Sequence, residues 1–258
     1  MPAIFTLLFV IFTFSAHTIC DKKNGGREMR KKISALALCA LLLTGCGAAA
    51  EADGTAMVTE KIKYVALTFD DGPRRGTTDM LLDGLGERGA AATFFLIGES
   101  IYGNEDLVAR MAAEGHQIGN HTWSHLRLET EPRETVTAEI ARTEEALHAL
   151  LGGSGYWLRT PYGLLPQQAD IQVPLVKWNL DPRDWESRDK WKVVNAVMAE
   201  VEPGSIILLH DIYQPSVEAA LEIVDRLQEQ GYWFVTVEEL LKLSGIEAQP
   251  GVMYRSGT

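Results

Sequence analysis

The first candidate for chemistry is a pair of adjacent carboxylates, Asp70 and Asp71. They follow the apolar run Tyr64-Val65-Ala66-Leu67, which is typical of a buried strand, and they precede Gly72-Pro73, which ends a strand and opens a turn. Two carboxylates at one turn repel each other when both are ionised, so they usually need a cation or a shared proton. Taken alone, the pair also fits a solvated turn of the Asp-Asp-Gly-Pro kind.

A second candidate is the pair His121 and His125 in His-Thr-Trp-Ser-His. On a helix or a tight turn, histidines four residues apart can both face one metal ion. Adding one Asp from another strand gives two nitrogens and one oxygen and leaves positions open for water and substrate, as in catalytic zinc sites. The same ligands also suit iron or cobalt. Two histidines at this spacing are equally often unrelated to a metal.

The elements that must position these residues alternate between short apolar strands and amphipathic helices. Strands are expected at 61–69, 92–97, 117–120, 156–159, 175–178, 205–209 and 233–236. Helices are expected at 77–88, 106–114, 132–151, 190–201, 215–230 and 237–243. This pattern predicts an α/β fold with a parallel sheet, either open or closed as a barrel.

Polar residues recur where the expected strands end, which is the face that such folds use for chemistry. The residues concerned are Asp70, Asp71, His121, His125, Arg159, Pro161, Tyr162, Asp184, Trp185, His210 and Asp211. Asp211 is interpreted as a helix-start or loop carboxylate without a catalytic role. Trp123 and Trp157 suit either sugar stacking or the core.

With these residues in view, the chain resembles polysaccharide deacetylases with a NodB homology domain, carbohydrate esterase family four. The resemblance covers about residues 60–245. Its five motifs occur in order as Thr-Phe-Asp-Asp-Gly from Thr68, His-Thr-Trp-Ser-His from His121, Arg-Thr-Pro-Tyr-Gly from Arg159, Asp-Pro-Arg-Asp-Trp from Asp181 and Leu-Leu-His from Leu208. The resemblance implies a distorted (β/α) barrel with fewer than eight strands.

The resemblance also implies a divalent metal, with zinc expected first and cobalt or another divalent ion as alternatives. Its ligands would be Asp71, His121 and His125. Asp70 would be the general base, and Arg159 would pair with Asp70 and orient it. An arginine beside a carboxylate favours the ionised form, which a base requires.

The resemblance implies that His210 is the general acid and that Asp184 positions it. Histidine suits this role because its charge changes near neutral pH. The remaining implied residues bind the oxyanion or shape the groove and acetyl pocket, and they are Pro161, Tyr162, Trp185 and Leu208. The expected reaction is hydrolytic N-deacetylation of an acetylated amino-sugar polymer.

Peptidoglycan is the expected polymer, and chitooligosaccharides and acetylxylan are the alternatives within the family. Two readings from other classes remain. A non-haem iron oxygenase would use the same two-His, one-carboxylate set but would leave Asp70, Arg159 and His210 unexplained. A non-catalytic glycan-binding lipoprotein would need neither a base nor an acid.

The N-terminal 45 residues read as a signal segment. Arg30-Lys31-Lys32 precedes an apolar run from Ile33 to Leu43, too short to span a bilayer, and Leu43-Thr44-Gly45-Cys46 resembles a lipoprotein lipobox. A plain secretory signal is the alternative. Met29 is a candidate true start, because the apolar stretch of residues 3–16 lacks a basic n-region.

These features predict an extracytoplasmic protein anchored to the bacterial cell membrane by a lipid on Cys46. The expected organisation is a tether at 46–60, a deacetylase domain at 61–245 and a C-terminal tail at 246–258. A monomer is expected. The formal charge is −11, and without residues 1–45 the Lys and Arg fall from 24 to 18 and the Asp and Glu from 35 to 33, which gives −15. Such acidity argues against nucleic acid as a partner.

Overall fold

The computed structural model describes residues 62–167 and 170–258. The signal segment, Met29, Cys46 and the tether therefore lie outside the described residues. The described strands are β1 (Lys63–Asp70), β2 (Thr93–Leu96), β3 (Gln117–Asn120), β4 (Leu175–Val176), β5 (Ile206–His210), β6 (Tyr232–Phe234) and β7 (Met253–Tyr254). The described helices are α1 (Thr77–Arg88), α2 (Gly98–Ile101), α3 (Glu105–Ala113), α4 (Arg133–Leu151), α5 (Asp184–Ser187), α6 (Lys190–Glu200), α7 (Gln214–Glu229) and α8 (Val237–Leu243).

The main sheet is parallel and has the order β3-β2-β1-β5, and β6 pairs with the first residues of β1. Single parallel bridges extend it, since Leu158 links β3 to β4 and Leu180 lies beside β5. The result is the expected α/β architecture of a distorted, incomplete barrel. Because every strand pair in this sheet is parallel, the carboxyl ends of the strands meet at one edge.

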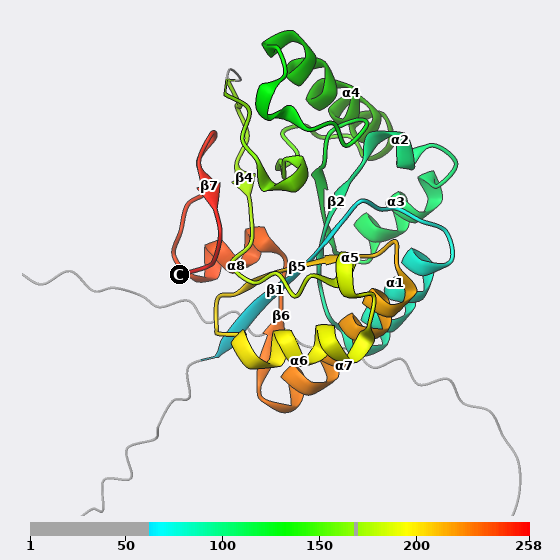
Figure 1. The fold of residues 1–258 in the computed structure, drawn as a ribbon, viewed down its shortest axis with the longest axis vertical. Helices are drawn as coiled ribbons and strands as arrows, with labels where there is room; N and C mark the ends of the chain where they lie inside the picture. Colours follow the sequence, from blue (N-terminus) through cyan, green and yellow to red (C-terminus); the bar gives the residue numbers. More distant parts are fainter. Residues whose placement is uncertain (1–61, 168–169) are drawn as a thin grey trace, which may run out of the picture. The chain divides into compact units, whose positions relative to one another are not determined.

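Helices cover the outer face of the strands (Figure 1). Helices α6 and α7 lie side by side, and α1 packs against α7. The side chains of β1 that face them, Val65, Leu67 and Phe69, are fully buried in one apolar cluster. Burial of this kind stabilises by about 25 cal/mol per Å² of apolar surface, so it holds the strand that ends at Asp70 against the helices.

Three parts of the chain differ from the sequence expectation. The expected strand at 156–159 reduces to bridges at Leu158, and β4 is only two residues long. The stretch expected to be a tail contains β7, which pairs with β4 in parallel, and Ser256 bridges to Ser205. These pairings are long-range, and the polar sequence around them has no strand periodicity that would predict them.

Trp123 is buried, with 7% of its surface exposed, and its ring contacts Arg142 and Tyr102. Trp157 is half-buried and packs against the second apolar cluster. Both tryptophans therefore belong to the packing rather than to the site described below. Within the described part of the chain, no helix combines the length and apolar character needed to cross a membrane.

Candidate active site

A pocket of about 480 Å³ opens at the carboxyl edge of the sheet. Its walls bring together residues from six of the loops and strand ends: Asp70, Asp71, His121, His125, Tyr162, Trp178, Asp181, Trp185, Leu208, His210 and Tyr213. Most of the predicted site residues are in this list. Arg159 and Asp184 lie directly behind it, fully buried, and Pro161 is buried in the turn that carries Tyr162.

Asp71, His121 and His125 present one ligand atom each, and these atoms lie within 4.8 Å of one another. The Oδ1 atom of Asp71 is 3.5 Å from Nε2 of His121 and 3.4 Å from Nε2 of His125. These separations are long for hydrogen bonds, and this Oδ1 is buried without a hydrogen-bond partner. Ligands of a tetrahedral ion with bonds of about 2.0–2.1 Å stand about 3.3 Å apart, so the three side chains fit a metal ion.

His121 is oriented by its other ring nitrogen. Nδ1 lies 2.7 Å from the carbonyl oxygen of Arg159, so Nδ1 carries the hydrogen and Nε2 offers its lone pair to the pocket. Burial disfavours the charged imidazole, but the carboxylates of Asp70 and Asp71 outweigh burial and raise the pKa of His121. A bound cation would take the place of that extra proton.

The loop from His121 to His125 is not helical, and Thr122 and His125 have positive φ angles of 67° and 58°. Glu139 of α4 holds this loop by accepting hydrogen bonds from the backbone amides of Trp123 (3.1 Å) and Ser124 (2.9 Å) and from the Ser124 hydroxyl (3.0 Å). Glu139 is not among the residues that the sequence motifs predict for the site. The available signal was a glutamate on the apolar face of a helix, between Val136 and Thr143.

Asp70 is buried beside an equally buried arginine. Its Oδ1 accepts a hydrogen bond from Nη1 of Arg159 at 2.8 Å. Other N–H groups of Arg159 donate to Thr68, Val176 and Lys177, so the guanidinium is held on three sides. Burial lowers the pKa of Arg159, and Asp70 opposes that shift. The carboxylate is therefore fixed 3.7 Å from Nε2 of His121, outside the three-residue ligand group.

His210 faces the same space from the end of β5. Asp184 accepts two hydrogen bonds from this one residue, from the backbone amide at 2.8 Å and from Nδ1 at 2.9 Å. Burial lowers the pKa of His210, but the hydrogen bond and charge of Asp184 prevail and raise it to about 9. The Nε2–H of His210 points toward the ligand group, 4.0 Å from Oδ2 of Asp71.

Asp71 is ionised at neutral pH, because its pKa lies far below 7. Burial alone would favour the protonated acid, but His121, His210 and His125 together lower the pKa of Asp71 to about 2. Its backbone has a positive φ of 73°, and its carboxylate and that of Asp70 lie on either side of Nε2 of His121, at 3.5 and 3.7 Å. The two adjacent acids thus meet different partners: Asp70 an arginine and Asp71 three histidines.

Asp211 lies in the loop between β5 and α7, as the sequence suggested, but it is not a solvent-exposed carboxylate. It is fully buried, accepts a hydrogen bond from the Thr78 hydroxyl and lies against Gly72, where any Cβ would collide with its carboxyl group. Burial raises the pKa of Asp211 to about 7. The sequence around Asp211 does not indicate its burial, because the residues that it contacts belong to the turn after β1 and the start of α1.

Trp178, Asp181 and Tyr213 also line the pocket, although the sequence analysis assigned them no role. The predicted groove residues Trp185 and Tyr162 are 43% and 57% exposed, whereas Leu208 is buried at the floor. The Tyr162 ring lies 4.9 Å from that of His125. A few convergent polar groups between aromatic walls are the arrangement expected for a polar, ring-shaped substrate.

A buried acid–arginine pair, a metal-fitting triad and a histidine held by an aspartate are together the parts of a metal-dependent hydrolase. Residues 58–173 match the model of the family described as polysaccharide deacetylase. The chain belongs to this family, whose members are hydrolases.

Two relatives illustrate the match. The peptidoglycan-N-acetylglucosamine deacetylase PgdA of Listeria monocytogenes is 37% identical over 194 residues, covering 74% of this chain and 41% of that protein. A peptidoglycan-N-acetylglucosamine deacetylase of Bacillus cereus is 35% identical over 215 residues, covering 74% of this chain and 96% of that protein. The chain thus spans about two fifths of the length of the first relative.

Solved structures agree with the fold. A structure described as T48 deacetylase with substrate has a TM-score of 0.71 and 40% identity, covering 75% of this chain and 96% of that one. A family 4 acetyl xylan esterase from Clostridium thermocellum, in complex with a cobalt ion, has a TM-score of 0.70 and 33% identity, covering 75% and 98%.

Proposed function

We propose that this protein hydrolyses the N-acetyl groups of peptidoglycan amino sugars. The observation that carries the proposal is the separation of Asp70 and Asp71 into an arginine-paired carboxylate and a histidine-facing one at one pocket. Two relatives described as peptidoglycan deacetylases support the choice of polymer. Chitooligosaccharides and acetylxylan are the competing substrates.

The metal would be held by Asp71, His121 and His125. Two imidazoles and one carboxylate suit zinc, and the relative with bound cobalt makes cobalt the second choice. A divalent cation at this place supplies Lewis-acid polarisation of the acetyl carbonyl and activation of water. The nearby buried carbonyl of Arg159 keeps His121 in the tautomer that such a cation needs.

Asp70 is proposed as the general base. A base must be ionised, close to the reacting water and free of tight coordination. Asp70 meets the last condition because Arg159 occupies its Oδ1, and the same bond fixes its direction. Arg159 acts as a positioning residue, since it is fully buried and reaches the substrate only through Asp70.

His210 is proposed as the general acid for the leaving amine. Asp184 takes the hydrogen of Nδ1, so the proton available to the substrate is the one on Nε2. With its pKa raised to about 9, His210 carries that proton at neutral pH. An amine is a poor leaving group unless it is protonated as the carbon–nitrogen bond breaks, which is the task for a protonated histidine.

The remaining proposed roles concern the substrate. The turn at Pro161 and Tyr162 would supply a backbone N–H to the developing oxyanion, and Tyr162 has a positive φ of 59° that exposes this turn to the pocket. Leu208 at the floor would accept the acetyl methyl group. The half-exposed ring of Trp185 would stack on a sugar.

We further propose an extracytoplasmic location and a lipid anchor on Cys46, with the domain acting as a monomer. The lipobox pattern before Cys46 is what supports the anchor. A polymer of the cell wall is accessible to an enzyme tethered outside the membrane.

The test is acetate release from purified peptidoglycan, chitooligosaccharides and acetylated xylan, measured with the zinc-loaded and the cobalt-loaded enzyme. We expect the highest kcat/KM on peptidoglycan. Higher kcat/KM on acetylxylan or chitooligosaccharides would replace peptidoglycan as the substrate, and no acetate from any of the three would refute the proposal as a whole.

A further inference from the structure

The aromatic walls of the pocket each carry a cation. The guanidinium carbon of Arg188 lies 4.1 Å from the centre of the Tyr213 ring, and Nζ of Lys177 lies 5.5 Å from the Trp178 ring. Neither cation forms an ion pair within the described part of the chain. An exposed arginine held over a ring is already ordered, so it loses little rotamer freedom when it binds an anion.

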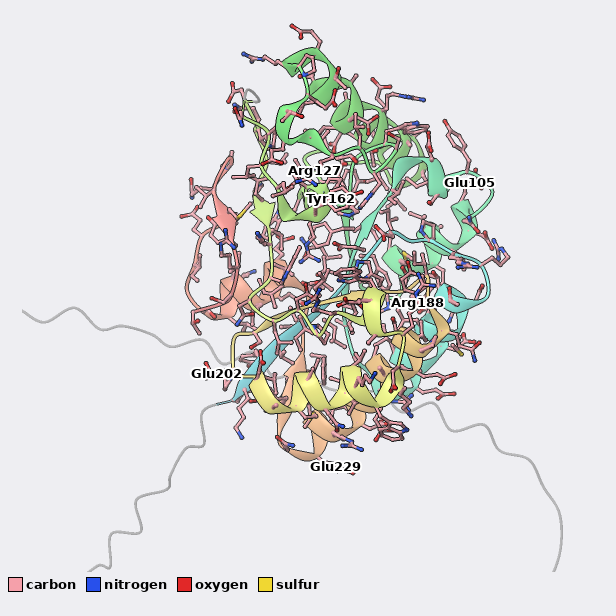
Figure 2. All side chains as sticks on the ribbon, viewed as in Figure 1. Glu105, Arg127, Tyr162, Arg188, Glu202 and Glu229 are labelled. Carbon is pink, nitrogen blue, oxygen red and sulfur yellow. The ribbon has the colours of Figure 1, made fainter. Side chains whose placement is uncertain are left out.

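The other two walls have cations that are already paired. Arg127 lies 5.8 Å from the Tyr162 ring and forms an ion pair with Glu129 at 3.1 Å. Arg183 lies 5.6 Å from the Trp185 ring and pairs with Glu186 at 2.8 Å. Figure 2 labels Arg127 and Tyr162 next to each other and Arg188 apart from them, beside α5. Arg188 is therefore the closest of the four cations to its ring and lacks a carboxylate partner.

Arg188 is the residue that caps the C-terminal end of α5, where its backbone N–H donates to the carbonyl of Asp184 at 2.9 Å. Its φ is 45°, in the left-handed region, where a residue other than glycine costs about 1–2 kcal/mol. The other non-glycine residues with positive φ in the described chain all belong to the site or flank it: Asp71, Thr122, His125, Tyr162 and Arg183. A left-handed residue is common at a helix C-cap, so this conformation fixes Arg188 at the end of α5.

Arg188 has hydrogen-bond donors to spare. Its Nε donates to the carbonyl of Trp185 at 3.3 Å, and its terminal nitrogens have no acceptor in the described structure. A guanidinium with two free parallel N–H groups matches a carboxylate in two-point geometry. The ring under it, Tyr213, lines the pocket and lies 6.4 Å from that of His210, so Arg188 adjoins the pocket at the wall next to the proposed general acid.

We propose that Arg188 binds a carboxylate of the glycan substrate, so that the enzyme prefers anionic amino-sugar polymers to neutral ones. This inference rests on the proposed deacetylase function. The chain has a net charge of −11, so its overall field repels an acidic polymer and a local cation is needed to reverse that repulsion at the pocket. Acidic side chains that line the pocket, such as Asp181, add to this repulsion of an anionic substrate, and an unpaired arginine beside the pocket would oppose it.

Such a carboxylate has two sources in peptidoglycan. In glycan strands stripped of peptide, the lactyl group of each muramic acid ends in a free carboxylate. In intact strands that group is an amide, and the carboxylates belong to the stem peptide. Both present the same anion to Arg188, whereas chitooligosaccharides and acetylxylan present none.

The experiment measures kcat/KM for acetate release from chitotetraose, from peptide-free glycan oligomers and from peptide-bearing oligomers of the same length. The variants are Arg188→Gln, which removes the charge, and Arg188→Lys, which keeps it. The control is Arg226→Gln, because Arg226 also lies over an aromatic ring, 5.5 Å from that of Trp191, but Trp191 is not a pocket residue, whereas Tyr213 beneath Arg188 is.

We expect the ratio of kcat/KM on the anionic oligomers to that on chitotetraose to fall by roughly three- to tenfold in Arg188→Gln, the range of a partly exposed ion pair. Arg188→Lys should fall less, and Arg226→Gln should keep the wild-type ratio. In the wild type, 0.5 M salt should reduce the same ratio. A fall confined to peptide-free or to peptide-bearing oligomers identifies which carboxylate is bound.

A ratio in Arg188→Gln within twofold of the wild type would overturn the inference and leave the deacetylase function standing. An equal loss on neutral and anionic oligomers would do the same, because it would mean that Arg188 only supports the wall formed by Tyr213. Absence of acetate from all three substrates with the wild type would instead remove the proposed function, and this inference with it.

Discussion

The division of work between Asp70 and Asp71 is open to a direct test with Asp70→Asn and Asp71→Asn. In Asp70→Asn the amide oxygen still accepts from Arg159, whose bonds to Thr68, Val176 and Lys177 remain. The charge that compensates a fully buried guanidinium is lost, however, which costs about 3 kcal/mol at the low end of broken buried pairs. For a domain of this size the melting temperature should fall by about 6–12 °C.

The fold should therefore survive at 25 °C, where the rate can be measured. General base catalysis is worth roughly 10²–10⁴-fold, so Asp70→Asn should lose at least that factor in kcat, about 3–5 kcal/mol of barrier. Its metal content should not change, because Asp70 lies outside the ligand group. Asp71→Asn should lose metal along with activity, since an amide oxygen is a weaker and uncharged ligand.

The assay is acetate release at saturating chitooligosaccharide, with metal content determined by elemental analysis after dialysis of the same preparations. Arg159→Lys is the suitable companion variant, and we expect it to keep metal and lose part of the rate. Arg159→Ala would leave the buried carbonyl oxygens of Val176 and Lys177 without donors, so its main effect would be to destabilise the fold. If Asp70→Asn loses the metal while Asp71→Asn keeps it, the two roles are exchanged and the reasoning fails.

Further predictions concern the support of the site, its buried acid and the anchor. Glu139→Ala should weaken metal affinity about 10–100-fold while Glu134→Ala, an exposed change on the same helix, should not; equal affinities by competition with a chelator would contradict the role of Glu139. The pKa of Asp211 is raised from 3.8 to about 7, so the folded state keeps its proton to a higher pH than the unfolded state does. The free energy of unfolding should therefore fall by about 4 kcal/mol, owing to this group, as the pH rises from about 4 to 7. Asp211→Asn should remove that fall in urea titrations of metal-free protein, and parallel curves for variant and wild type would show that Asp211 does not titrate as described. Cys46→Ser should move the protein from the membrane fraction to the soluble fraction, because the lipid supplies the anchorage, and unchanged fractionation would refute a lipid on this residue.

Much of the fold and most of the proposed site could be predicted from the sequence because the signals are local. An apolar run followed by Asp70-Asp71-Gly72-Pro73 predicts both a buried strand and the turn at which the chain leaves the sheet. Alternation of strands and helices implies a parallel sheet, and a parallel sheet gathers such ends at one edge. The motifs also carry a family resemblance, which the comparisons confirm.

Only the tertiary structure shows which side chains contact residues that are distant in the sequence. Glu139 reaches the His121–His125 loop from a helix, and Asp211 reaches the turn after β1 from the loop that follows β5. Each is an ordinary acid in its own sequence neighbourhood, and its partners come from distant parts of the chain; for Asp211, burial there also raises the pKa. Arg188 is another example, because it meets Tyr213 only where the end of α5 packs near the start of α7. Such long-range contacts follow from how the elements pack, and no local pattern of residues encodes them.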